Sequence, residues 1–140
     1  MTRLLIAEDH TAMREKVIGT LEVEYVVLAA VADGQQMLEE ESRLHPDVIV
    51  LDISMPGMNG IEAATVLKQR SPGAKIIFLT VHEEPVFIDA AFAAGATGYV
   101  VKSRLVSDLC LAVREAVAGR RFISPTLNID SCECGNQLLA

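Results

Sequence analysis

Five short apolar segments recur along the chain, and most are continuous rather than alternating with polar residues. Continuous runs of this length are typical of strands that other elements cover on both faces. We therefore predict five buried strands, at RLLIA (3–7), VVLAAV (26–31), DVIVL (47–51), KIIFLT (75–80) and TGYVV (97–101).

Between these segments, apolar residues recur at intervals of three and four, as on one face of a helix. Segment 34–45 is the weakest of these predicted helices, because only three apolar residues support it. The clearer stripes are Met13, Val17 and Leu21; Ile61, Ala64 and Leu67; Val86, Ala90 and Ala93; and Leu105, Leu109, Ala112, Val113 and Ala116.

The alternation of strand and helix predicts an α/β fold in which helices cover both faces of a parallel sheet. Right-handed crossovers leave few topologies. At 140 residues, the pattern favours the flavodoxin-like (βα)5 fold, a doubly wound three-layer sandwich with strand order 2-1-3-4-5. Clear periodicity ends near Gly119, so we expect one domain over 1–121. We expect a tail over 122–140, partly ordered near Phe122 and Ile123.

Composition and charge argue against several classes of protein. The net charge is −7 with 51% apolar residues, which does not favour direct nucleic-acid binding. The apolar runs are too short to span a membrane, and acidic residues follow the first run too early for a signal peptide. Three cysteines do not form a disulfide framework. We expect a cytoplasmic domain without membrane contact.

Chemically capable residues stand at the ends of four of the five predicted strands. Glu8 and Asp9 follow the first strand, Asp52 follows the third, Thr80 ends the fourth and Lys102 follows the fifth. In open α/β sheets, the working crevice lies beyond the carboxyl ends of the strands, where the strand order reverses. We expect these five side chains to converge there.

Three converging carboxylates raise one another's pKa unless a cation holds them together. Oxygen ligands and room for water favour Mg²⁺ over zinc, with Mn²⁺ as a substitute, because no His or Cys lies at ligand spacing. Lys102 and Thr80 supply donors for phosphoryl oxygens. Asp52 is therefore equipped to form an aspartyl phosphate, in a transfer that needs charge neutralisation more than a protein base.

Each of these residues also has an ordinary structural explanation. Asp9 is suited to cap the helix that begins near Thr11, and Thr80 is a β-branched residue of the kind common in strands. Lys102 is equally suited to a solvated strand end. The functional hypothesis depends on the combination, because complementary chemistry at four strand ends is harder to explain than any one residue.

The motifs at these positions resemble those of response-regulator receiver domains of bacterial two-component signalling, over residues 1 to about 121. The stretches LTVHEE (79–84), AGATGYVVKS (94–103) and LCLAVREAVAGRRFIS (109–124) most resemble the NarL/FixJ (LuxR-type) branch, whose members usually carry a C-terminal helix-turn-helix. We expect no such module here, because fifteen residues after Pro125 cannot supply it. The matching stretches are AEDH (7–10), LDISMPGMNGIEA (51–63), FLTVH (78–82) and AGATGYVVKS (94–103).

The resemblance implies specific roles for the acidic residues. Asp52 would accept the phosphoryl group from a phosphohistidine of a sensor histidine kinase or phosphotransfer protein. Asp9, Asp52 and the backbone carbonyl of Ser54 would bind Mg²⁺, with Glu8 acting through water. Such a domain would catalyse only its own phosphorylation and slow dephosphorylation, so it would not be an enzyme in the usual sense.

The resemblance also implies a switch. Thr80 and Lys102 would hold the phosphoryl oxygens, and Tyr99 would swing inward as Thr80 moves. The output surface would comprise the fourth predicted helix, strand 97–101 and the last predicted helix. It would bind a downstream protein, while the first and last helices are the alternative contact in a homodimer. The ordinary explanation for Tyr99 is a half-buried aromatic that fills space at a strand edge.

Other readings remain as alternatives. A Mg²⁺-dependent phosphatase with an Asp nucleophile needs a second Asp two residues later as its general acid/base, and this chain has Ser54 there. A flavodoxin-like cofactor binder needs a glycine-rich phosphate-binding loop after the first strand. This chain has the acidic stretch EDHTA (8–12) there. The chain also fits the receiver fragment of a DNA-binding transcriptional regulator.

Ser103 follows Lys102, where many receivers have a proline that is often cis, so we predict a trans bond.

Val81 generates a testable prediction, because it is bulkier than the small residue common at this position in receivers. We expect Val81 to narrow access to the phosphoryl group and to slow its hydrolysis. Val81→Ala should therefore shorten the lifetime of the phosphorylated form several-fold, as measured by the decay of the phosphoprotein after donor removal. An unchanged lifetime would contradict this expectation.

Overall fold

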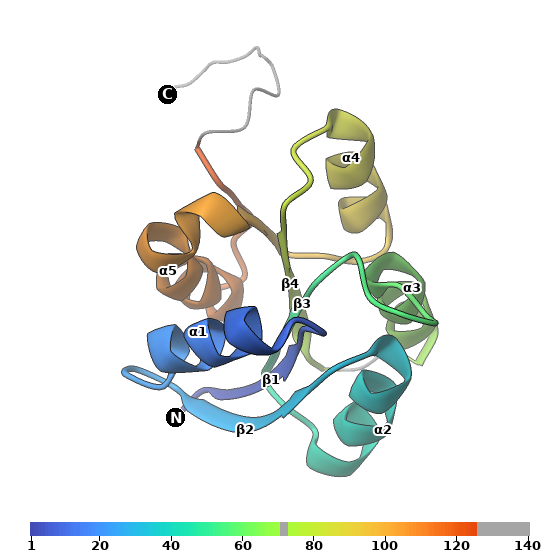
Figure 1. The fold of residues 1–140 in the computed structure, drawn as a ribbon, viewed down its shortest axis with the longest axis horizontal. Helices are drawn as coiled ribbons and strands as arrows, with labels where there is room; N and C mark the ends of the chain where they lie inside the picture. Colours follow the sequence, from blue (N-terminus) through green and yellow to red (C-terminus); the bar gives the residue numbers. More distant parts are fainter. Residues whose placement is uncertain (71–72, 126–140) are drawn as a thin grey trace.

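The computed structural model describes residues 1–70 and 73–125 as a six-stranded sheet between two layers of helices (Figure 1). The predicted tail beyond Pro125 lies outside the described residues. The strands are β1 (Arg3–Ala7), β2 (Val26–Val31), β3 (Val48–Leu51), β4 (Lys75–Thr80), β5 (Gly98–Val101) and β6 (Phe122–Ile123). The helices are α1 (Thr11–Leu21), α2 (Gly34–Leu44), α3 (Gly60–Arg70), α4 (Pro85–Ala93) and α5 (Leu105–Val117), with a 3₁₀ turn, η1, at Lys102–Arg104.

All neighbouring strands pair in parallel, in the order β2-β1-β3-β4-β5-β6. The predicted doubly wound fold and the order 2-1-3-4-5 are therefore confirmed. The strand order reverses at β1, so the carboxyl ends of β1 and β3 flank the crevice that such sheets use for ligands. The predicted trans bond after Lys102 is also confirmed, since the described residues contain no cis peptide bond.

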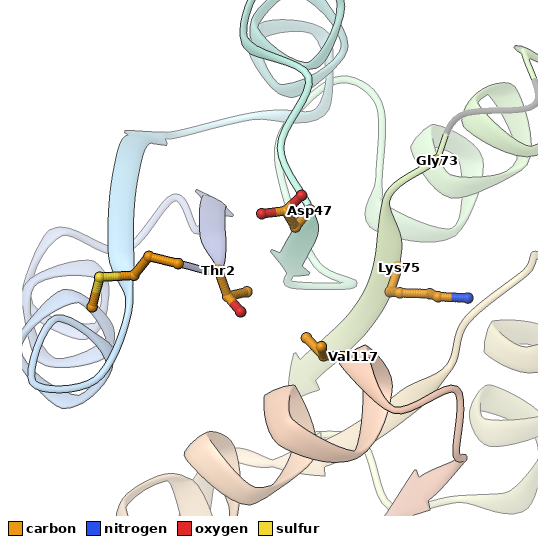
Figure 2. A pocket seen from close by; sticks show the side chains of 6 residues that line it. Thr2, Asp47, Gly73, Lys75 and Val117 are labelled. Carbon is orange, nitrogen blue, oxygen red and sulfur yellow. The ribbon is translucent and has the colours of Figure 1, made fainter.

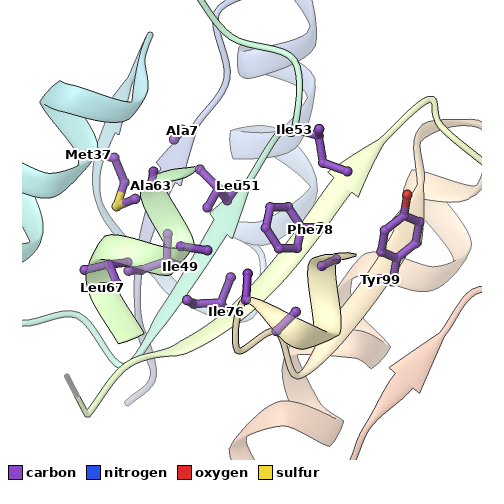
Figure 3. Packing of buried hydrophobic residues seen from close by; sticks show 14 of the residues in the cluster. Ala7, Met37, Ile49, Leu51, Ile53, Ala63, Leu67, Ile76, Phe78 and Tyr99 are labelled. Atoms are coloured by element: carbon purple, nitrogen blue, oxygen red, sulfur yellow. The ribbon is translucent and has the colours of Figure 1, made fainter. Parts of the chain in front are cut away.

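The continuous apolar pattern of the strands arises because both faces of the sheet are covered. Helices α1 and α5 pack on one face, and α2, α3 and α4 pack on the other (Figure 1). Successive residues of β1 serve the two faces in turn: Leu4 and Ile6 join the first layer, while Leu5 and Ala7 join the second. Figure 3 shows the second layer, in which Tyr99 lies at the end of the cluster nearest β6.

The partial order expected near Phe122 and Ile123 takes the form of a sixth strand. Gly119 has a φ of +81° and reverses the chain after α5, so that Phe122 and Ile123 return parallel to β5. The predicted domain boundary at residue 121 falls one residue before this strand. A two-residue strand is too short for a hydrophobic period to reveal it.

No helix within residues 1–70 and 73–125 combines the length and the apolar character needed to cross a bilayer.

The loop between β3 and α3 folds back tightly on the end of β3. The Gly60 amide donates a hydrogen bond to the carbonyl oxygen of Ile53 at 2.8 Å. Asn59 and Glu62 cap the helix reciprocally, since each side chain accepts from the other residue's amide. A Cβ atom on Gly60 would lie 2.0 Å from the carbonyl oxygen of Asp52, so only glycine allows this approach.

Gly60→Ala is expected to destabilise the protein by about 1–3 kcal/mol, because the backbone at Asp52 must shift to admit the methyl group. Gly19→Ala in α1 is the matched control, since a Cβ there meets no atom within 4 Å. That change should stabilise the protein by about 0.5–1 kcal/mol through helix propensity. Urea denaturation measures both, and equal effects of the two changes would contradict the predicted clash.

Candidate functional site

Three carboxylates converge at the carboxyl ends of β1 and β3. Glu8, Asp9 and Asp52 each offer an oxygen, and these oxygens lie within 4.8 Å of one another. Glu8 and Asp52 are buried, with 2% and 5% exposure, while Asp9 is exposed. The site therefore has a buried acidic floor and one carboxylate at its solvent-facing rim.

Lys102 brings a positive charge to this floor from the 3₁₀ turn after β5. Its ammonium nitrogen lies 2.8 Å from Glu8 Oε1 and donates a hydrogen bond to Asp52 Oδ2 at 3.1 Å. Within the described chain, the Lys102 ammonium is the charged partner of the buried Glu8 Oε1. Four of the predicted site residues are thus brought together from three separate segments.

The pKa shifts follow from burial and from these charges. Burial raises the pKa of Glu8, and the nearby Lys102 ammonium offsets this only in part. Burial opposes the charge on Lys102, yet Glu8 and Asp52 together raise the pKa of Lys102 above its ordinary value. The lysine is therefore an ammonium at neutral pH and faces more negative charge than it can neutralise.

These residues fit a hard divalent cation. Three carboxylates form the ligand set that Mg²⁺ accepts, and the single Lys102 ammonium leaves part of their negative charge unbalanced. Neither His nor Cys belongs to this cluster, so the donor chemistry does not favour zinc.

Thr80 lies at the carboxyl end of β4, beside β3 and β5 in the sheet, and is completely buried. Its hydroxyl oxygen accepts a hydrogen bond from the His82 amide at 3.2 Å. The structure thus places the predicted hydroxyl at the correct edge of the sheet, where it supports the loop between β4 and α4.

A contact that sequence reasoning missed connects the two loops at the rim. Ser54 Oγ lies 2.9 Å from His82 Nε2, which joins the β3–α3 loop to the β4–α4 loop. The His82 ring also stacks on Phe87 of α4, with centroids 4.1 Å apart. Residues 28 positions apart leave no local signal of such a contact in the sequence.

Tyr99 points inward from β5 and is completely buried. Its hydroxyl donates a hydrogen bond to the carbonyl oxygen of His82 at 2.9 Å. Burial raises the pKa of Tyr99, with the charges of Glu84 and Glu83 acting in the same direction. The side chain therefore remains a hydrogen-bond donor, and it connects β5 to the loop that follows Thr80.

A separate depression lies at the opposite, amino-terminal end of the strands. Its volume is about 420 Å³, and Figure 2 shows the side chains that line it, among them Asp47 and Lys75. Asp47 has a structural role there, because its carboxylate accepts from the Arg3 amide at 2.8 Å and its carbonyl accepts from the Lys75 amide. This depression contains none of the predicted site residues.

Comparison with known proteins agrees with this geometry. The family model described as "Response regulator receiver domain" matches residues 4–114. The response regulator GacA of Pseudomonas viridiflava is 34% identical over 91% of this chain and 60% of its own length. The nitrate/nitrite response regulator protein NarL of Escherichia coli (strain K12) is 34% identical over 89% of this chain and 58% of its own length.

Solved structures are also similar. A two-component response regulator of the LuxR family from Aurantimonas sp. SI85-9A1 has a TM-score of 0.86 and 35% identity, covering 91% of this chain and 93% of that one. The chemotaxis protein CheY4 of Vibrio cholerae has a TM-score of 0.75 and 31% identity, and the match covers 81% of this chain and 97% of that one.

A doubly wound parallel sheet with an acidic site at its switch point defines a class of α/β signalling domains that includes the CheY-like proteins. This chain belongs to the response-regulator receiver domain family, and its relatives include NarL- and LuxR-type regulators. The predicted resemblance is therefore confirmed. The chain spans about 60% of the length of the GacA relatives that it matches.

Glu8→Gln tests the electrostatics of the metal-free site. A pKa that is raised on folding means that ionised Glu8 costs stability at pH 7, and this cost vanishes as the pH falls below 4.5, the ordinary value. The variant should therefore be more stable than wild type at pH 7 in chelator, and the difference should shrink at pH 4.

Urea denaturation at the two pH values, with chelator or with Mg²⁺, measures this effect. Mg²⁺ should stabilise wild type more than Glu8→Gln, because the variant has one carboxylate fewer to hold the ion through water. A variant that is less stable than wild type at pH 7 in chelator would contradict the prediction.

Proposed function

We propose that this chain is a phosphoacceptor receiver in which Asp52 takes a phosphoryl group from a phosphohistidine. The observation that carries the proposal is the hydrogen bond between Asp52 and Lys102 beside two further carboxylates. A carboxylate that is paired with an ammonium and buried in a polar crevice is positioned as a nucleophile.

In the proposed reaction, a carboxylate oxygen of Asp52 attacks phosphorus while the bond from phosphorus to the donor's histidine nitrogen breaks. The electron pair of that bond returns to the imidazole. Lys102 and the Thr80 hydroxyl hold the phosphoryl oxygens, and this positions the group for in-line transfer. Asp9, Asp52 and the backbone carbonyl of Ser54 would hold a Mg²⁺ or Mn²⁺ ion, with Glu8 acting through water, and the ion would supply charge neutralisation for the phosphoryl group.

The proposed partners follow from this chemistry. The phosphoryl donor is a sensor histidine kinase or a phosphotransfer protein, and a water molecule later removes the group slowly. The output is a protein contact by the face of α4, β5 and α5, with a homodimer as the alternative. The family assignment supports a cytoplasmic location, where such kinases present their phosphohistidines.

The names of the relatives bear on the alternatives. Curated relatives such as NarL are named as response regulators, and DegU of Brevibacillus brevis is named a transcriptional regulatory protein. The receiver portion of a DNA-binding transcriptional regulator is therefore the second candidate function. A Mg²⁺-dependent phosphatase is disfavoured, because Ser54 stands where the catalytic acid of such an enzyme is expected.

Asp52→Asn is the test of the proposal. Wild type incubated with Mg²⁺ and acetyl phosphate should gain one phosphoryl group by intact mass, while Asp52→Asn should gain none. Chelator should abolish the gain in wild type. Asp89→Asn, an exposed carboxylate on α4, is the matched control and should be phosphorylated like wild type. Phosphorylation of Asp52→Asn, or phosphorylation without metal, would overturn the assignment.

A further inference from the structure

The edge of β5 is covered by the chain's own segment Arg121–Ser124, which we name the β6 clamp. Gly98 and Tyr99 pair in register with Phe122 and Ile123. The Phe122 amide donates to the carbonyl oxygen of Thr97 at 3.1 Å. A partner that approaches β5 from its open side therefore meets β6 rather than the strand that carries Tyr99.

Ser124 ends this pairing with two bonds to β5. Its amide donates to the carbonyl oxygen of Tyr99 at 2.9 Å, and its hydroxyl oxygen accepts from the Val101 amide at 3.1 Å. The hydroxyl thus takes the place of a backbone carbonyl, just before Pro125, which has no amide hydrogen to continue the pairing. Ser124 is buried, with 1% exposure, so its polar atoms depend on these partners.

The β6 clamp is also attached to both neighbouring helices. Arg121 lies over the ring of Phe92 in α4, with its guanidinium carbon 4.3 Å from the ring centroid. On the α5 side, Phe122 packs against the apolar cluster that includes Leu109 and Val113. The clamp therefore bridges the three elements of the proposed output face.

A series of hydrogen bonds runs from Thr80, at the carboxyl end of β4, to the β6 clamp. The Thr80 hydroxyl accepts from the His82 amide, and the His82 carbonyl accepts from the Tyr99 hydroxyl. The Tyr99 carbonyl then accepts from the Ser124 amide. A rotation of the Thr80 side chain that carries its hydroxyl oxygen toward a phosphoryl group on Asp52 would move that oxygen away from the His82 amide and break the first of these bonds.

We propose that the β6 clamp is the output element of this receiver, which carries the phosphorylation state of Asp52 to the end of the described chain at Pro125. The proposal rests on the proposed function for the phosphorylation step. It goes beyond that function, because it assigns the response to residues outside α4, β5 and α5. In this assignment, the hydrogen bonds of β6 to β5 are weakened when Thr80 turns toward Asp52.

Tyr99→Phe tests the coupling without any phosphorylation, because it removes only the hydroxyl that binds His82. Amide hydrogen exchange by NMR should show the Phe122 and Ser124 amides exchanging about threefold faster or more than in wild type. Tyr25→Phe is the matched control, since it removes a tyrosine hydroxyl that donates to the Cys110 carbonyl in α5. Unchanged exchange in Tyr99→Phe, or equal acceleration in the control, would overturn the coupling.

The second arm uses wild type with Mg²⁺ and acetyl phosphate, after intact mass has established the phosphorylated fraction. The amides of Phe122 and Ser124 should exchange faster in the phosphorylated protein, while amides that pair β1 with β2 should not change. Phosphorylation without this change overturns the output role and leaves the proposed function intact. Failure to gain the phosphoryl group overturns the proposed function instead, and the output role falls with it even if Tyr99→Phe shows the coupling.

Discussion

The structure depends on an electrostatic imbalance at the carboxyl ends of the strands. Three carboxylates meet one ammonium within a largely buried crevice, and a single lysine neutralises only one of the three charges. Such an arrangement is costly in a low-dielectric environment unless further positive charge enters. The strand order, the reversal at β1 and the turn after β5 all serve to bring these groups together. The proposed dependence on Mg²⁺ and the proposed phosphoryl chemistry both derive from this imbalance.

Most of the fold could be predicted from the sequence, because the strands of a sheet covered on both faces need continuous apolar runs. These runs differ from the helical stripes of apolar residues between them. The starts of β1, β2 and β4 match the predicted segments. The sixth strand was only partly anticipated. It has two residues, and it forms because Gly119 reverses the chain and the Ser124 side chain accepts a hydrogen bond from β5. Neither feature produces a hydrophobic period in the sequence.

The acidic site could be predicted from the sequence for a topological reason. Parallel strands end at one edge of the sheet, so residues at strand ends meet even when they are distant in the chain. The contacts around the rim could not be predicted from the sequence. The Ser54–His82 bond depends on how two loops lean together, and Tyr99 bonds to a backbone carbonyl that every residue type possesses. The sequence therefore identifies the chemical groups, whereas coordinates are needed to describe how they are connected.

The tight approach of Gly60 to Asp52 has a mechanical consequence. The β3 side of the crevice is fixed by backbone packing at Gly60 and by the backbone hydrogen bond to Ile53. The β4 side is held by a threonine hydroxyl and a histidine ring, which are side-chain contacts that a bond rotation can rearrange. The two sides of the crevice therefore differ in rigidity, and the loop between β4 and α4 is the side that can adjust to a group attached to Asp52 by rotation of side chains.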